Sequence, residues 1–123
     1  MSEKKVNDLT QTNSLGLVNI SEEVLETITN ISTKEIEGVM GLYGHITDDI
    51  AGIFTKKNHT KGVHVQVIDE KAVIDLDIVV NFGVKIPEVA WQVQENVKNA
   101  IENMTQIKVE TVNVNVASIN FVK

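Results

Sequence analysis

Two carboxylates and one imidazole are the residues whose spacing comes closest to acid–base chemistry. Asp75 and Asp77 lie two positions apart in an alternating stretch, so both fall on one face of a predicted strand. The hairpin expected below places His64 opposite Asp77, as an acid–base couple would require. An open sheet face offers no dry pocket in which such groups become reactive, and polar residues there usually solvate the sheet. We therefore predict that the chain is not an enzyme.

Metal and cofactor chemistry lack the residues that they need. The histidines are His45, His59 and His64, and no two of them have a ligand spacing on one regular element. The chain contains no cysteine, which excludes a thiolate zinc site and a disulfide and fits a reducing compartment. No P-loop, GxSxG or dinucleotide fingerprint occurs. We predict no cofactor and no metal.

The charge balance argues against nucleic-acid binding. Of the 123 residues, 17 are acidic and 11 are basic, for a net charge of -6, and no arginine is present. Phosphate recognition needs clustered basic side chains, and base stacking needs aromatic ones, which make up only 4% of the chain. The short GxxG at Gly41–Gly44 encloses Leu42 and Tyr43 instead of basic residues, so turn glycines explain it better than a nucleic-acid-binding loop.

Protein contact is the remaining class, and two sets of residues are candidates for it. Trp91 falls on the polar side of a predicted helix, together with Glu95 and Lys98. This tryptophan is either an interface anchor or a side chain folded over the rim of the sheet. The second set is basic and indicates either a solvated loop or a site for an acidic partner or an anionic lipid surface. It consists of Lys56, Lys57 and Lys61.

The elements that must position these residues begin with a hairpin in the middle of the chain. Alternating apolar residues in 63–68 and 72–80 predict two strands, and a two-residue turn at Glu70–Lys71 satisfies both faces. The expected opposite pairs are Val67 with Ile74, Val65 with Leu76, Val63 with Ile78, Gln66 with Asp75 and His64 with Asp77.

Two helices and further strands complete the predicted domain. Ser21 is a good N-cap for a helix over about 21–36, whose apolar face is Val24, Ile28 and Ile31. A second helix over 86–104 has a continuous apolar stripe. The stripe consists of Ile86, Val89, Ala90, Val93, Val97, Ala100, Ile101 and Met104. The remaining predicted elements are short strands at 15–20 and 39–43, a helix start near 47, and a final strand whose phase slips at Ala117–Ser118.

This order predicts an α+β fold, a two-layer sandwich in which two main helices cover one face of a sheet of about four to five strands. Residues 1–14 are polar and aperiodic and are predicted to be a disordered tail, and residues 15–123 a single domain. No secretory signal and no run of apolar residues long enough for a spanning helix is present. We expect a cytoplasmic protein without direct membrane insertion. Self-association through an edge strand is a further expectation, with the final strand as the candidate.

Several segments resemble a known family. They are GLVNISEEVLETI, IEGVMGL, KGVHVQV, AVIDLDIVVNFGVKIPEVAWQVQENVKNAIENMT and VETVNVNVASINF, and in this order they resemble the alkaline shock (envelope stress response) proteins of Gram-positive bacteria over about residues 15–122. The chain departs from the family at Gln106, where relatives usually have glycine after Met-Thr, and at Asn81-Phe82, where tyrosine is common.

The resemblance implies a non-enzymatic cytoplasmic adaptor or scaffold in envelope stress or homeostasis. Its partner would be a protein, in some relatives a membrane-anchor protein that recruits it to the membrane. An alternative that the resemblance also allows is a regulator of lipid metabolism that binds a fatty-acid-synthesis enzyme such as acetyl-CoA carboxylase.

Overall fold

The computed structural model describes residues 9–44 and 62–121, with side chains from residue 12 onward. It contains two helices and six strands in these residues. In chain order they are β1 (Leu9–Asn13), β2 (Gly16–Ile20), α1 (Glu22–Lys34), β3 (Val39–Leu42), β4 (Val63–Ile68), β5 (Lys71–Asn81), α3 (Ile86–Thr105) and β6 (Lys108–Asn120).

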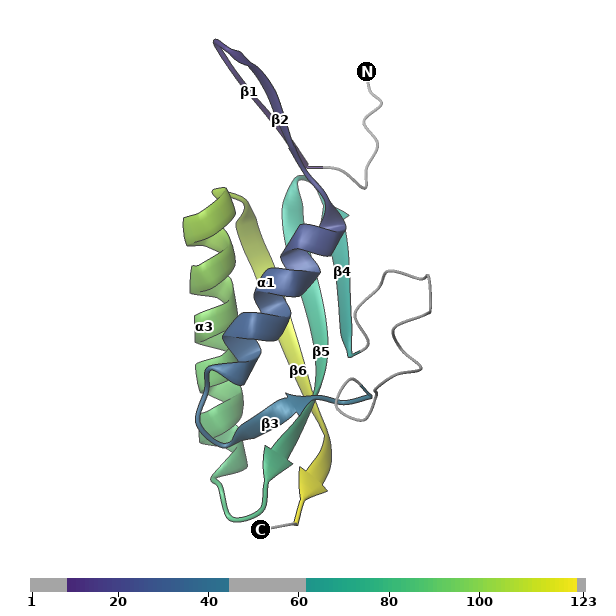
Figure 1. The fold of residues 1–123 in the computed structure, drawn as a ribbon, viewed down its shortest axis with the longest axis vertical. Coiled ribbons are helices and arrows are strands. Elements are labelled where there is room, and N and C mark those ends of the chain that lie inside the picture. The colour runs from purple at the N-terminus through teal and green to yellow at the C-terminus, as the bar shows by residue number, and fades with distance from the viewer. Residues whose placement is uncertain (1–8, 45–61, 122–123) are drawn as a thin grey trace.

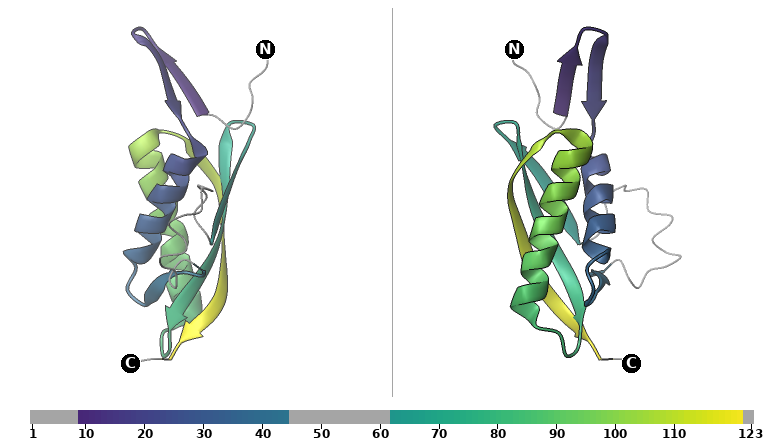
Figure 2. Two further views of the ribbon diagram at one scale, coloured as in Figure 1. Left: turned by 45° about the vertical axis from the view of Figure 1, so that its right-hand side comes forward. Right: turned by 90° about the vertical axis from the view of Figure 1, so that its left-hand side faces the viewer.

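Strand β5 lies at the centre of a four-stranded sheet. It pairs with β6 in parallel along one side and with β4 and β3 antiparallel along the other. Helix α3 provides the crossover that parallel strands β5 and β6 require. Both helices lie on the same face of this sheet (Figures 1 and 2). The predicted α+β two-layer sandwich is therefore confirmed, with a separate two-stranded hairpin at its N-terminal end.

Strands β3 and β4 lie end to end along one side of β5. The two strands meet at Asp77, whose carbonyl accepts from Tyr43 N (2.8 Å) and whose N–H donates to Gly62 O (2.9 Å). Gly62 has a φ of +86°, and a Cβ there would lie 2.9 Å from the carbonyl oxygen of Tyr43. Only glycine fits at this junction without strain.

The β4–β5 hairpin has the predicted faces but not the predicted register. Its turn is at Asp69–Glu70, both with positive φ (53° and 68°), so Val65 lies opposite Ile74 and Val63 opposite Leu76. The predicted turn was one residue too late, which shifts the pairing by two positions. Because the side-chain period of a strand is two, this error leaves every residue on the expected face.

Helix α1 begins as predicted and is shorter than predicted. Ser21 is its N-cap and accepts from Val24 N (3.3 Å), while the helix ends at Lys34 instead of 36. The predicted apolar face is wrong in part: Ile28 is buried, but Val24 and Ile31 are exposed. The helix instead buries Leu25 and Ile28 together with polar side chains, namely Glu26, Thr29, Ser32 and Thr33.

Helix α3 matches its prediction closely. Pro87 lies in its first turn and the helix buries an apolar stripe of Val89, Val93, Val97 and Ile101. Met104 is an exception to the predicted stripe, because its side chain is 70% exposed. The helix ends at Gln106, which has a left-handed conformation (φ 69°) and donates its N–H to Glu102 O (2.9 Å). Glycine is favoured in this conformation, which accounts for the glycine that relatives usually have here, and Gln106 adopts the same conformation with a side chain.

The two ends of the chain give one confirmation and one correction. The β5–β6 register shifts between Val116 and Ser118, so the bulge predicted at Ala117–Ser118 is present. Residues 9–13 were predicted to belong to a disordered tail, but they form β1, which pairs with β2 from Leu9↔Ile20 to Asn13↔Gly16. The predicted helix start near 47 lies outside the described residues.

Candidate functional site

The open face of the sheet carries hydrogen-bonded pairs of amide and carboxylate side chains. Asn113 donates to Asp75 Oδ1 (2.8 Å), and Asn115 donates to Asp77 Oδ1 (3.0 Å). Each pair lies side by side because β5 and β6 are parallel and in register there. Both carboxylates thus accept from a neutral amide on the next strand, which stabilises the pairing of the strands.

His64 does not form the couple considered from the sequence. The β4–β5 register places it opposite Asp75 and not Asp77, and its Nε2 lies 3.5 Å from Gln66 Nε2. In residues 9–44 and 62–121, no group of three His, Cys, Asp or Glu side chains is arranged to hold a metal ion. The open face is therefore an array of paired polar groups.

Trp91 lies on the solvent side of α3. Its side chain is 59% exposed, and Glu95 and Lys98 follow it at i+4 and i+7 on the same side of the helix, both exposed. Lys98 Nζ is 3.9 Å from Glu102 Oε2, one turn further along. The structure thus brings Trp91, Glu95 and Lys98 together as one surface, which we call the Trp91 face. The other candidate set, Lys56, Lys57 and Lys61, lies outside the described residues.

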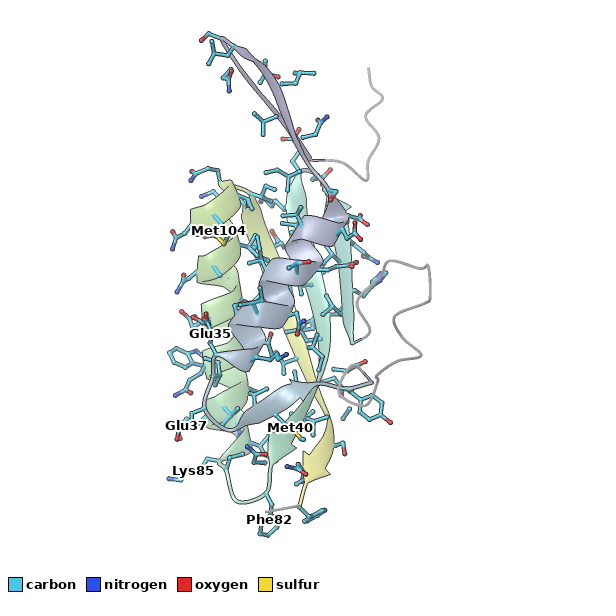
Figure 3. All side chains as sticks on the ribbon, in the orientation of Figure 1. Glu35, Glu37, Met40, Phe82, Lys85 and Met104 are labelled. Carbon is cyan, nitrogen blue, oxygen red and sulfur yellow. The ribbon has the colours of Figure 1, made fainter. Side chains whose placement is uncertain are left out.

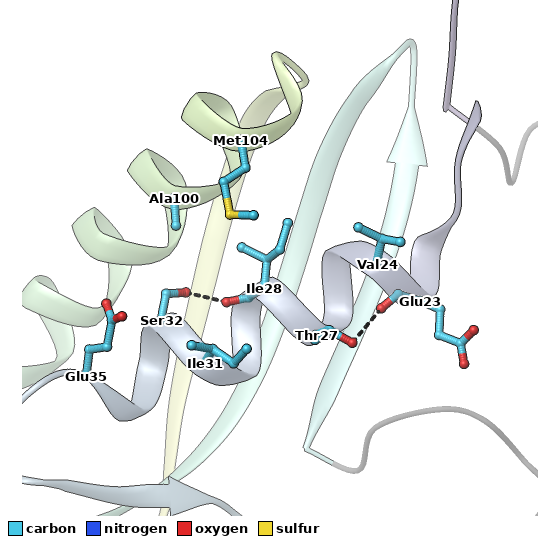
Figure 4. A pocket seen from close by; sticks show the side chains of 9 residues that line it. All are labelled: Glu23, Val24, Thr27, Ile28, Ile31, Ser32, Glu35, Ala100 and Met104. Atoms are coloured by element: carbon cyan, nitrogen blue, oxygen red, sulfur yellow. Dashed lines mark hydrogen bonds between the residues drawn. The ribbon is translucent and has the colours of Figure 1, made fainter. Parts of the chain in front are cut away.

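A second surface was not predicted from the sequence. Between α1 and α3 lies a groove with a volume of about 510 Å³, which we call the α1–α3 groove. It is lined by Glu23, Val24, Thr27, Ile28, Ile31, Ser32, Glu35, Ala100 and Met104. Met104 points from α3 toward Ile28 on α1 (Figure 4). Met104 lies near the C-terminal end of α3, far from Phe82 at the other end of the two-layer domain (Figure 3).

The groove offers mainly apolar contact. The hydroxyl of Thr27 donates to Glu23 O (3.0 Å) and that of Ser32 donates to Ile28 O (2.7 Å), so both are engaged by their own helix. The two glutamates among the lining residues, Glu23 and Glu35, lie at opposite ends of α1. A ligand of this groove must therefore be apolar where it lies between these two carboxylates.

The spacing of the two helices at one end of the groove is set by hydrogen bonds. Asn96 of α3 donates to Ser32 O (2.8 Å) and to Glu35 Oε1 (2.9 Å) at the C-terminal end of α1. At the other end of the groove Met104 and Val24 are exposed. The packing of the two helices thus forms the groove.

The sequence held a signal for the groove that periodicity alone could not resolve. Val24, Ile31 and Met104 each continue a helical apolar pattern, and each was assigned to the core for that reason. An apolar residue at the margin of such a pattern is buried only if another element covers it. Here the margins of the two helices face each other over the groove, and nothing in the described part of the chain covers them.

Neither described helix is both long enough and apolar enough to cross a membrane.

The fold and these surfaces define a small two-layer α+β domain with exposed apolar surfaces on its helical layer. Residues 10–121 match the alkaline shock protein 23 family, whose description is a cell envelope-related function. The chain belongs to this family, which confirms the resemblance to alkaline shock proteins.

Three proteins of Gram-positive bacteria are similar in sequence to this chain. The chain is 40% identical over 107 residues to the uncharacterized protein YqhY of Bacillus subtilis, with 87% of this chain and 79% of that protein covered. It is 35% identical over 109 residues to the uncharacterized protein Spy1535 of Streptococcus pyogenes, with 88% and 82% covered. A stress response regulator gls24 homolog of Streptococcus pyogenes is 25% identical over 105 residues, which are 85% of this chain and 59% of that protein.

Solved structures with a related fold include variants of the MamM CTD. One of them superposes with a TM-score of 0.50 and 14% sequence identity, and covers 79% of this chain and 94% of that chain. At this level of identity the likeness concerns the fold alone.

Proposed function

We propose that this protein is a non-enzymatic adaptor in cell-envelope homeostasis that binds a partner protein through the Trp91 face. In this proposal the protein is cytoplasmic, and an envelope-associated partner recruits it to the membrane. The cell envelope-related description of the family supports the setting. The name of the gls24 relative, a stress response regulator, supports a role in stress.

The observation that carries the proposal is the exposure of Trp91 on a well-anchored helix. The opposite side of α3 is fixed to the sheet by fully buried Val93 and Val97. Gln94 adds a hydrogen bond to Val112 O (2.9 Å) on β6. A large aromatic side chain on a rigid element can enter a partner's pocket with little loss of conformational entropy, which is why tryptophan is enriched in binding hot spots.

Glu95 and Lys98 give this surface a mixed charge. Charged residues around a hydrophobic anchor set the orientation and the association rate of a complex more than its affinity. We therefore assign them a secondary role in the same interface. The alternative role, regulation of a fatty-acid-synthesis enzyme, rests on the resemblance alone, and no feature of the described residues favours it.

The test is the capture of partners by the full chain and by a Trp91→Ala variant. Tagged proteins would be expressed in the native cells, extracted in mild detergent and isolated, and the bound proteins identified by mass spectrometry. We expect an envelope-associated protein to bind the unmodified chain and to be lost with Trp91→Ala. The matched control is Gln92→Ala, a change at an exposed residue on a neighbouring side of α3, which should retain the partner.

Purified components then distinguish the two functions. If Trp91→Ala retains every partner, the Trp91 face is not the binding site. If the captured proteins are carboxylase subunits and the chain changes their catalytic rate, the regulatory alternative replaces the adaptor.

A further inference from the structure

The N-terminal hairpin β1–β2 stands apart from the rest of the domain. Its strands pair with each other and with no strand of the four-stranded sheet, and it extends beyond the N-terminal end of α1 (Figures 1 and 2). We call residues 9–20 the arm. An isolated two-stranded hairpin is at best marginally stable in water, because it has little apolar surface to bury. The arm therefore needs another surface to pack against.

The arm presents apolar side chains to solvent. Leu15 is 95% exposed at the tip and Leu17 is 66% exposed on β2, with Val18 also exposed. The side chain of Asn13 fixes the tip, since its Oδ1 accepts from Leu15 N (2.7 Å) and Gly16 N (3.1 Å). Leu15 is thus held outward at the end of the arm, in the position from which it can enter an apolar groove.

The arm cannot reach the groove of its own molecule. Strand β2 ends at Ile20 and α1 begins at Glu22, so a single residue, Ser21, connects them. The arm leaves from the N-terminal end of α1, whereas the groove runs along α1 toward Glu35. Folding the arm back over the groove would require the loss of the Ser21 cap and of the first turn of α1.

Charge leaves the arm and the α1–α3 groove as surfaces through which two copies of the chain can meet. Two copies with a net charge of -6 repel each other over most of their surfaces. Residues 9–21 contain no charged side chain, and the groove is apolar between its two terminal glutamates. These are two surfaces that can meet without placing like charges in contact.

We propose that the arm of one copy docks in the α1–α3 groove of a second copy, with Leu15 and Leu17 against Ile31 and Met104. A five-residue strand is about 17 Å long and the groove from Val24 to Ile31 about 10 Å, so the arm spans it. Each copy offers one arm and one groove, so that a reciprocal exchange closes a two-fold dimer. This interface is separate from the Trp91 face and leaves that face free.

The absence of cysteine from the sequence allows a direct test. Full-length Leu15→Cys and Met104→Cys chains with different tags would be mixed and mildly oxidised. We expect disulfide-linked pairs that contain one chain of each kind. The control is Leu15→Cys mixed with Glu95→Cys, an exposed position on the Trp91 face, which should give little cross-linking. Pairs of Leu15→Cys with itself only, or equal yields with Glu95→Cys, would overturn the proposal.

The mass of the protein in solution gives a second test. Sedimentation analysis of the unmodified chain should show a dimer, and Leu17→Asp on the arm or Ile31→Asp in the groove should each halve the mass. Circular dichroism checks that the helices and the sheet remain folded. Trp91→Ala should stay dimeric, so that failure here and failure of the adaptor function are distinguishable. A monomer at all concentrations, or dimers that persist in both aspartate variants, would overturn the proposal.

Discussion

Helices α1 and α3 cover the same face of the same sheet, yet they bury different side chains. The buried residues of α3 are mostly branched aliphatics, such as Val93, Val97 and Ile101, all fully buried. Helix α1 buries Leu25 and Ile28 along with four polar residues, and leaves Val24 and Ile31 exposed. The two helices are similarly amphipathic in sequence, so the difference lies in how each is rotated about its axis.

The difference indicates a division of roles between the helices. Burial of apolar surface is the main stabilising term in folding, so α3 contributes more to the stability of the domain than α1 does. The polar side chains of α1 are in part satisfied within the helix, as in the bond from Thr29 Oγ1 to Leu25 O (2.7 Å). The exposed apolar residues of α1 are then available for binding, and segments with less apolar burial are often the binding segments.

The largest expected effect concerns apolar truncation on each helix. Ile101→Ala should lower the free energy of unfolding by about 2–5 kcal/mol, because it leaves a cavity under α3. The matched change Ile31→Ala on α1 should cost less than about 0.5 kcal/mol in the monomer, because Ile31 is exposed. Urea denaturation at low protein concentration measures both. If both substitutions lower the free energy of unfolding by the same amount, α1 and α3 do not differ in their contribution to stability.

The second prediction concerns the polar residues buried under α1. Thr33 is fully buried, and its hydroxyl has no hydrogen-bond partner within the described residues. Thr33→Val keeps the shape and removes that hydroxyl, so it should raise the free energy of unfolding by about 1 kcal/mol. Thr29→Val is the control, since the hydroxyl of Thr29 has a hydrogen-bond partner, and this substitution should not raise the free energy of unfolding. Destabilisation by Thr33→Val in thermal denaturation would count against this account of α1.

The third prediction concerns the end of α3. Gln106 adopts a left-handed conformation that disfavours residues with a Cβ. Gln106→Gly should therefore stabilise the domain by about 1 kcal/mol, in spite of the greater entropy that glycine has in the unfolded chain. Gln106→Ala retains a Cβ and should give no such gain. Equal stability of the two variants in urea would show that the backbone conformation there carries no cost.

The smallest effect is expected on the exposed side of α3. Lys98 and Glu102 form an ion pair at i,i+4 with an N–O distance of 3.9 Å. Lys98→Ala should change the free energy of unfolding by less than about 0.5 kcal/mol, and the change should shrink further at high salt. If Lys98→Ala lowers the free energy of unfolding as much as Ile101→Ala does, the exposed side of α3 contributes to the stability of the fold and does not serve binding alone.

The predictions from the sequence succeeded where a pattern is local and repeated. The alternation in β4 and β5 gave the correct faces in spite of a turn placed one residue late, since a shift by two positions preserves the face. The helical stripe of α3, apart from Met104, and the slip at Ala117 were also predicted correctly. The candidate Trp91 face follows from the same helical period.

The predictions failed where the answer depended on contacts between distant elements. The first strand of the arm, β1, was assigned to a disordered tail because its sequence is largely polar and shows little periodicity, whereas a strand was predicted at 15–20, where β2 lies. The groove was missed because Val24, Ile31 and Met104 fit a core pattern. The local sequence does not determine how far each helix is rotated about its axis, and this rotation decides which apolar residues face the sheet.

The sequence by itself thus determined the α+β class, the faces of the central hairpin, the span of α3 and the family. These depend on periods of 2 and 3.6 residues and on turn residues, which act within a short stretch of chain. The tertiary structure alone decided that α1 buries threonine and serine, that Val24, Ile31 and Met104 line a groove, and that residues 9–20 extend as an arm. The physical reason is that the burial of a side chain depends on which element covers it. The packing of α1 against α3 and the sheet brings together residues more than sixty positions apart in the chain, such as Asn96 and Ser32.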